Sequence, residues 1–273
     1  MTDARAAPFE PRLALASLSG RSDAEWARAA GGFADAAFLG GIALDESTRE
    51  AARRMVDRDR EEFLPEDPLA FVDGQLAALA DAPLRAGFNV RASGPEPIRA
   101  AAAVCAERDA VVEINAHCRQ DEMCAAGAGE SLLREPDRLV ESVSAAAETG
   151  ATVSVKVRTE LAGVDLPAVA ARVDGAGTDF LHVDAMDSEE VVADVVDATD
   201  AVVVANNGVR DRETVREYLA HGADAVSVGR PSDDPRVLRR VRAAVDEWFG
   251  GDDDETVARA QGPTTARPGG RDQ

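Results

Sequence analysis

The chain has 273 residues, 45% of them hydrophobic, which is enough for a domain with a buried core, and no apolar run reaches the roughly 20 residues of a membrane span. The N-terminus lacks the pattern of a secretory signal, so we expect a cytoplasmic protein with no membrane partner. With 51 acidic and 30 basic residues the formal net charge is -21, which repels nucleic acid at low salt but suits a cytosol of molar salt, where the Debye length is about 3 Å. We therefore hypothesise a halophilic protein.

The first third of the chain carries the less regular structural signals. Short apolar runs predict strands, and Ala-rich amphipathic stretches predict helices. In chain order we expect strands at 13–18 and 34–39, helices at about 47–63 and 68–80, a strand at 84–90 and a helix at 95–107.

From residue 110 onward strands and helices alternate regularly. Each predicted strand is a nearly continuous apolar run, as expected when helices cover a parallel sheet. We expect strands at 111–115, 152–157, 180–183, 201–205 and 225–228, helices near 137–148, 166–174, 188–197 and 212–221, and a closing helix at about 235–249.

Eight strand–helix units without a Gly-rich turn after the first strand favour a (β/α)8 TIM barrel. A doubly wound open sheet is the alternative architecture. We expect the barrel to occupy residues 1–250. The charged, Gly- and Pro-rich residues 251–273 are expected to form a disordered tail.

Polar residues follow the fourth predicted strand, where a barrel places its chemistry. The strand stops at Asn115, and the chain continues into His117 and Cys118. We interpret Cys118 as a proton donor or nucleophile at the barrel mouth; the alternative is a structural thiol in a surface loop. With Cys105 and Cys124 it forms no Cys-x-x-Cys pair, so we expect neither a metal site nor a disulfide.

Lys156, within the fifth predicted strand, is the only lysine of the chain. Its compact ammonium at a strand end would stabilise negative charge on a bound ligand, whereas the alternative is a lysine that extends to solvent. On the sixth strand, His182 and Asp184 share one face. His182 is a candidate for cofactor contact, against the alternative of a hydrogen-bonded core histidine.

The turns after the seventh and eighth strands carry a third group of candidates. Asn206, Asn207 and Gly208 follow one strand, and Gly229 and Arg230 follow the other. Barrels commonly bind phosphate at these two positions with backbone amides and a helix N-terminus. Each sequence alone is also an ordinary turn, but together they predict a phosphate-bearing cofactor.

At these positions the sequence resembles the dihydrouridine synthases, and more distantly the dihydroorotate dehydrogenases, over about residues 13–230. Residues 115–118 are similar to the family's Asn-x-Gly-Cys-Pro, and residues 153–158 are similar to its Val-Thr-Val-Lys-x-Arg strand. Asn206 falls on an Ala-Asn-Gly-Asp segment, and residues 229–230 fall on a Gly-Arg pair. Asn89 takes the position of a flavin-contacting glutamine, while Ala16 and Ser17 stand in the first-strand flavin segment.

The resemblance implies an FMN enzyme on a barrel, reduced by NAD(P)H, which passes a hydride to C6 of uracil while a cysteine protonates C5. It implies that Cys118 is this acid, that Lys156 meets flavin or uracil oxygens, and that Asn115 orients the base. The phosphate would be bound by the amides of Asn207, Gly208, Gly229 and Arg230.

The sequence departs from the family in ways that leave the substrate open. The segment 117–119 replaces Gly-Cys-Pro, and Asp184 stands where the family has a histidine. We also expect no counterpart of the family's C-terminal tRNA-gripping domain after Gly250, as in an archaeal side branch. Three functions therefore remain: reduction of uridine in tRNA, with a partner protein supplying RNA contacts; FMN chemistry on a free pyrimidine or other small molecule; and a non-catalytic binding barrel. The oligomeric state is open.

Overall fold

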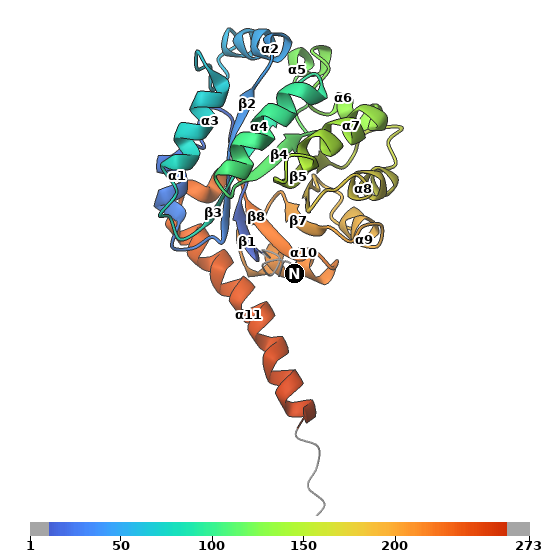
Figure 1. Ribbon diagram of the computed structural model, residues 1–273. Helices are drawn as coiled ribbons and strands as arrows, with labels where there is room; N and C mark the ends of the chain where they lie inside the picture. The colour runs from blue at the N-terminus through green and yellow to red at the C-terminus, as the bar shows by residue number, and fades with distance from the viewer. Residues whose placement is uncertain (1–10, 261–273) are drawn as a thin grey trace, which may run out of the picture.

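The chain folds into a closed barrel of eight parallel strands in sequential order, surrounded by helices (Figure 1). The structure is a computed structural model that describes residues 11–260, with side chains to residue 250. The predicted (β/α)8 TIM barrel is confirmed. The strands are β1 Leu13–Leu15, β2 Ala36–Ala43, β3 Arg85–Arg91, β4 Val111–Asn115, β5 Thr152–Arg158, β6 Phe180–Asp184, β7 Val202–Asn206 and β8 Ala225–Val228.

Helices connect the strands on the outside of the barrel. They are α1 Ala24–Ala30, α2 Glu46–Val56, α3 Pro68–Ala77, α4 Pro95–Glu107, α5 Asp121–Ala125, α6 Ser131–Arg134, α7 Pro136–Ala147, α8 Leu166–Asp174, α9 Val191–Val196, α10 Arg212–Ala220 and α11 Pro235–Ala260, with the 3-10 helix η1 Arg230–Asp233 before α11. None of the helices in this part of the chain combines the length and apolar character needed to span a membrane.

Several predicted bounds differ from the structure. The helix predicted at 47–63 ends at Val56, and the strand predicted at 34–39 continues to Ala43 through a register shift between Gly40 and Ile42. The closing helix predicted to end at residue 249 runs to Ala260. The predicted disordered tail, 251–273, lies for the most part outside the described residues, so its disorder stays a prediction.

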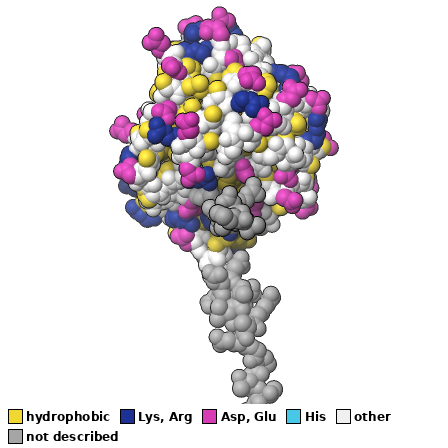
Figure 2. Space-filling view, viewed as in Figure 1, with side chains coloured by type: hydrophobic (Ala, Val, Ile, Leu, Met, Phe, Trp, Pro, Cys, Tyr) yellow, Lys and Arg dark blue, Asp and Glu magenta, His cyan; other side chains and the backbone are white. Residues whose placement is uncertain are grey.

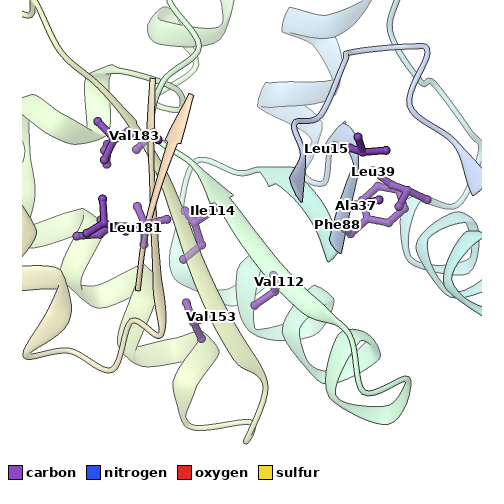
Figure 3. Close-up of a cluster of buried hydrophobic side chains, with 14 of the residues drawn as sticks. Leu15, Ala37, Leu39, Phe88, Val112, Ile114, Val153, Leu181 and Val183 are labelled. Atoms are coloured by element: carbon purple, nitrogen blue, oxygen red, sulfur yellow. The ribbon is translucent and has the colours of Figure 1, made fainter. Parts of the chain in front are cut away.

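Apolar side chains fill two layers on either side of the strands. One layer lies between the strands and the helices and includes Leu15, Leu39 and Val112 (Figure 3). The alternate residues face the barrel axis. There, the apolar side chains of the lower half form a compact plug. This plug consists of Ala14, Ala36, Phe38, Val111, Phe180, Val204 and Ala225.

Above this plug, at the carboxyl ends of the strands, the barrel interior becomes polar. The ring of His182 lies 5.2 Å from the ring of Phe38, at the boundary between the two halves. The next inward positions carry amides, hydroxyls and charged groups, all of them buried. The carboxyl end is the face at which TIM barrels place their active sites.

Candidate functional site

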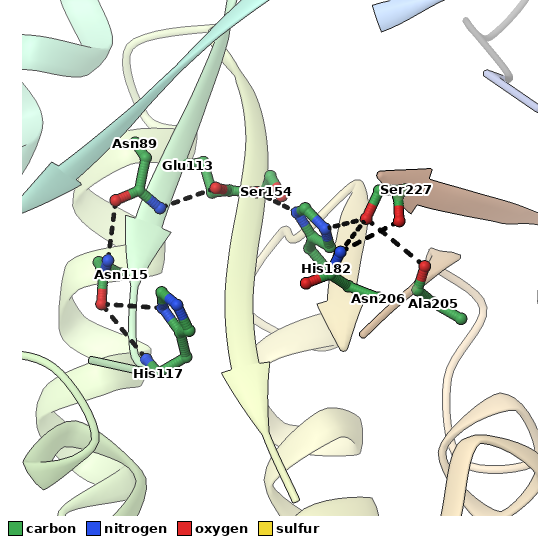
Figure 4. Close-up of polar contacts among 9 residues, drawn as sticks. All are labelled: Asn89, Glu113, Asn115, His117, Ser154, His182, Ala205, Asn206 and Ser227. Atoms are coloured by element: carbon green, nitrogen blue, oxygen red, sulfur yellow. Dashed lines mark hydrogen bonds and ion pairs between the residues drawn. The ribbon is translucent and has the colours of Figure 1, made fainter. Parts of the chain in front are cut away.

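A chain of hydrogen bonds crosses the polar half of the barrel from β4 to β7 (Figure 4). It begins at the amide of Asn115, which donates to Asn89 Oδ1 at 2.8 Å, and Asn89 Nδ2 donates to Glu113 Oε1 at 2.7 Å. The other oxygen of Glu113 lies 2.7 Å from His182 Nδ1 and accepts a hydrogen bond from Ser154 at 3.3 Å. Strand register pairs Asn89 with Glu113 and Glu113 with Ser154, while His182 pairs with Lys156, one inward position further along β5.

The second half of this series of hydrogen bonds runs through Ser227 on β8. His182 Nε2 lies 2.7 Å from Ser227 Oγ, which also accepts a hydrogen bond from Asn206 Nδ2 at 2.8 Å. Both ring nitrogens of His182 therefore have partners, and the side chain is fully buried. His182 thus supports the site from below and has no free nitrogen for another contact.

Glu113 and His182 form a buried pair whose charges depend on their surroundings. Burial alone raises the pKa of the Glu113 carboxyl, but the hydrogen bond and charge of His182, with Lys156 and Asn89, bring that pKa below its ordinary value. Burial, reinforced by the charge of Lys156, lowers the pKa of His182. We infer that Glu113 is a carboxylate at neutral pH and supplies the negative charge of the barrel interior.

Lys156 lies near the carboxyl end of β5, at the barrel mouth. Its register partners are Asn115 on β4 and His182 on β6, and its side chain is 2% exposed. Burial lowers the pKa of its ammonium, against the charges of Glu113 and Asp184. Within residues 11–250 its ammonium has no hydrogen bond and no ion pair. Its three donors are therefore left to solvent or to a ligand that enters the mouth.

The loop that carries Cys118 is held by Asn115. The side-chain oxygen of Asn115 accepts hydrogen bonds from the backbone N–H groups of Cys118, at 3.0 Å, and His117, at 3.3 Å. Gly129 packs on the same loop with φ +64°, and a Cβ there would lie 2.3 Å from the carbonyl oxygen of Cys118. The half-buried thiol is therefore fixed at the mouth through the same hydrogen-bond chain.

His117 lies beside the thiol among several cations. Burial lowers the pKa of His117 well below its ordinary value, and the charges of Lys156 and Arg91 act in the same direction. The imidazole is therefore neutral at neutral pH. It is a hydrogen-bond partner in the mouth and does not add to its positive charge.

The turns after β7 and β8 leave open space at the rim. Gly208 is exposed with φ +65°, and no atom of the described residues lies within 4 Å of the position that a Cβ would take at Gly229. Asn207 has φ +102°, and its side chain donates to Asp184 at 3.1 Å while its carbonyl oxygen accepts from Tyr218 at 2.9 Å. These contacts hold the turn in the left-handed conformation that exposes its backbone.

The structure brings some of the predicted site residues together and leaves others apart. Asn89, Asn115, His182 and Asn206 belong to one hydrogen-bond chain, which reaches Cys118 through the backbone. In the described part of the chain no hydrogen bond connects Ser17, Gly229 or Arg230 to it. Ala16 is buried at the end of β1, where its N–H donates to the carbonyl oxygen of Val228 at 2.9 Å, and Arg230 is exposed in η1.

Sequence reasoning missed Glu113 and Ser227, which hold the hydrogen-bond chain together. A signal for Glu113 existed, because it is the one charged residue inside the apolar strand β4. Ser227 sits in a short strand of small and apolar residues and carries no comparable signal.

The fold and the site together define a TIM barrel with a polar, partly unsatisfied active-site mouth. A family model described as dihydrouridine synthase (Dus) matches residues 79–258. The uncharacterized protein MJ0144 of Methanocaldococcus jannaschii is 25% identical over 238 residues, which cover 81% of this chain and 89% of that protein. Because the family model spans more than half of the chain, the chain belongs to the dihydrouridine synthase family, whose cofactor is FMN.

Solved structures share the fold at low sequence identity. Morphinone reductase in complex with tetrahydroNAD has a TM-score of 0.62 and 14% identity, covering 85% of this chain and 91% of that chain. The tryptophan synthase complex from Pyrococcus furiosus has a TM-score of 0.55 and 14% identity, covering 89% of this chain and 98% of that chain. At such identities the likeness extends to the fold alone.

Proposed function

We propose that the protein is an FMN-dependent reductase of the uracil C5=C6 double bond, with uridine in tRNA as its substrate and NAD(P)H as its electron donor. The observation that carries the proposal is the unpartnered, buried ammonium of Lys156 beside the Cys118 loop, in a chain of the dihydrouridine synthase family. A cation at this place would be stabilised by an anionic or oxygen-rich ligand.

The residues present fit a flavin mononucleotide. The ammonium of Lys156 and the amide of Asn89 would hold the ring system, with Ala16, Ser17 and Asn206 around it, and His182 would support these residues from below instead of bonding to the flavin as predicted. The open turns at Gly208 and Gly229 leave room for backbone N–H groups to bind a phosphate. The amides that would take the phosphate are those of Asn207, Gly208, Gly229 and Arg230.

The mechanism divides the work between the cofactor and the chain. The chemistry that bound FMN supplies is hydride transfer, from the reduced nicotinamide nucleotide to C6 of the pyrimidine ring. The Cys118 thiol donates the proton that C5 requires, which leaves a thiolate and a saturated C5–C6 bond. Asn115 orients the base and also fixes the Cys118 loop. A single side chain therefore positions both the proton donor and the base that accepts the proton.

A free pyrimidine is a second candidate substrate, and the charge of the mouth favours it. Exposed carboxylates stand in the loops after four strands, at Asp121, Glu160, Asp187 and Asp233. On the face shown in Figure 2, acidic side chains are scattered among arginines and apolar surface. Exposed arginines also stand in these loops, at Arg119, Arg210 and Arg230, so the carboxylates repel RNA phosphates locally, at contact. Action on tRNA would then need a partner protein that supplies basic RNA contacts.

The test is conversion of the two substrates by the purified protein, with FMN and NAD(P)H in molar salt, alone and with an extract of the gene-deletion strain that supplies a partner protein. Unmodified tRNA that gains dihydrouridine, and a gene deletion that removes dihydrouridine from cellular tRNA, are the expected results. Turnover of free uracil or dihydroorotate without any change in tRNA would move the function to the second candidate. Inactivity on all of these substrates would contradict both.

A Cys118→Ala variant tests the proton donor. We expect it to keep its flavin and its fold, because the loop is held through the backbone N–H of residue 118, and to lose about 10²–10⁴-fold in turnover. The measurement is single-turnover reduction of the substrate. The matched control is Cys105→Ala, in a buried thiol of the helical layer whose pKa burial raises to about 12. An unchanged rate in Cys118→Ala would place the acid elsewhere.

A further inference from the structure

A buried ion pair lies at the mouth beside the hydrogen-bond chain. Arg91 is the last residue of β3 and is 3% exposed, and the side chain of Glu62, between α2 and α3, is 1% exposed. Arg91 Nη1 donates to Glu62 Oε2 at 2.6 Å, and Nη2 donates to Ser19 Oγ in the loop after β1. Two loops that are distant in sequence thus fix one guanidinium.

The register places Arg91 beside the start of the Cys118 loop. Val90 pairs with Ile114, so the next residues of the two strands, Arg91 and Asn115, end side by side. A Cβ on Gly41 would lie 2.5 Å from Asn89 Oδ1 and 3.1 Å from Arg91 Nε. The amide of Asn89 and the guanidinium therefore border the same small space, which the glycine leaves free.

The pair is incompletely satisfied. Arg91 Nε and Glu62 Oε1 are buried and have no hydrogen-bond partner within the described residues. An unmade hydrogen bond on a buried charged group costs free energy, and a buried ion pair is weak evidence for stability. We therefore infer that the Arg91–Glu62 pair has a role other than stabilising the fold. The charge of Arg91 also reaches both Cys118 and His117.

Lys156 and Arg91 stand on the two strands that flank β4. Lys156 pairs with Asn115 from β5, and Arg91 lies next to Asn115 from β3. Both cations are buried, and in a water-excluded site a fixed charge acts much more strongly than it does in water. Among the described side chains Lys156 forms no ion pair, although the charges of Glu113 and Asp184 act on it, whereas Arg91 pairs directly with Glu62.

We propose that Arg91 is a second cation of the flavin site, which acts with Lys156 to stabilise reduced FMN and whose strength is set by Glu62. The inference rests on the proposed function, because it requires that FMN binds at this mouth. Two-electron reduction by the nicotinamide nucleotide transfers one hydride to FMN and adds one negative charge, which a nearby cation favours. Arg91 therefore raises the reduction potential, and the carboxylate of Glu62 limits that rise.

The test compares two variants with opposite expected effects. Arg91→Met removes the cation, so the affinity for reduced relative to oxidised FMN should fall about tenfold, which for a two-electron couple lowers the midpoint potential by about 30 mV. Glu62→Gln removes the opposing charge and keeps the shape, so the midpoint potential should rise. Arg91→Lys should stay close to the wild type. The measurement is spectroscopic titration of the FMN-loaded protein in molar KCl.

The controls separate charge from structure. Arg53→Met, at an exposed arginine of α2, should leave the potential unchanged. If Arg91→Met does not fold, as judged by circular dichroism, the sign of the Glu62→Gln shift decides. If the pair is purely structural, the midpoint potential should shift in the same direction in both variants, or in neither. That result would overturn this inference but not the proposed function. Wild-type protein that binds no FMN would overturn the proposed function, and this inference with it.

Discussion

At the scale of single residues, Glu113 holds the site together although it touches neither the mouth nor the solvent. It accepts hydrogen bonds from Asn89 and Ser154 and pairs with His182, so three strands depend on one carboxylate. Through Asn89 and Asn115 it also fixes the loop that carries Cys118. Loss of its charge should therefore lower the stability of the fold and disturb the position of the Cys118 thiol.

The Glu113 carboxylate should make stability depend on pH. Its pKa in the folded state lies below the ordinary 4.5, so its contribution is complete above that pH and is lost as pH falls through the lower, folded-state pKa. Glu113→Gln should be less stable than the wild type at pH 7, with a difference that shrinks below pH 4.5. Guanidinium unfolding between pH 3 and pH 7 measures it, with the exposed Glu50→Gln as control. A difference that is constant over this range would contradict the assignment.

Lys156 should lower the stability of the flavin-free protein and strengthen FMN binding. Because burial lowers the pKa of its ammonium, the folded protein holds this charge at a cost when no ligand is bound. We expect Lys156→Met to raise the free energy of unfolding of the flavin-free protein by about 1 kcal/mol and to weaken FMN binding at least tenfold. Unfolding curves with and without FMN check both signs. A variant that loses stability and keeps its FMN affinity would mean that Lys156 serves the fold.

At the scale of elements, the sequence predicted most of the barrel because the local signals agree with the final fold. The strand at 111–115 and the helix at 166–174 have the predicted bounds, since continuous apolar runs and N-cap residues mark them. β2 was predicted to end at residue 39, while the observed strand passes through Gly40 and Gly41 with a register shift. The helix α11 was predicted to end at about residue 249, just before Gly250, but it continues to Ala260.

The polar connections of the site could not be predicted in the same way. The strand ends indicated Asn115, Cys118 and Lys156, because polar residues that follow an apolar run stand out locally. The pairs His182 with Ser227 and Arg91 with Glu62 depend on the register between distant strands and on loop conformation. No local pattern contains that information.

The helix α10 begins with a capping box that also ends the turn after β7. Asp211 accepts a hydrogen bond from the N–H of Thr214 at 3.1 Å, and the hydroxyl of Thr214 reaches back to the N–H of Asp211. We expect Asp211→Ala to cost about 1 kcal/mol of stability. Guanidinium unfolding measures it, with Glu213→Ala, exposed in the first turn, as the control. Equal stability of the two variants would show that the cap is dispensable.

At the scale of the whole molecule, the net charge of -21 should make folding depend on salt. At low ionic strength the acidic surface repels itself, and at about 1 M salt the screening length falls to about 3 Å. We expect the thermal unfolding midpoint to rise steadily between 0.1 M and 2 M KCl. Circular dichroism melting curves measure this, and an unchanged midpoint with full helicity at low salt would contradict a halophilic protein.

The central claim, that this barrel is a flavin enzyme, is tested most directly by the visible absorption spectrum of the protein purified in molar salt. We expect a flavin spectrum, with the cofactor released as FMN on denaturation, and a loss of bound flavin in Lys156→Met. A colourless protein that cannot be reconstituted with FMN would contradict the claim and leave the buried ammonium at the barrel mouth for another ligand.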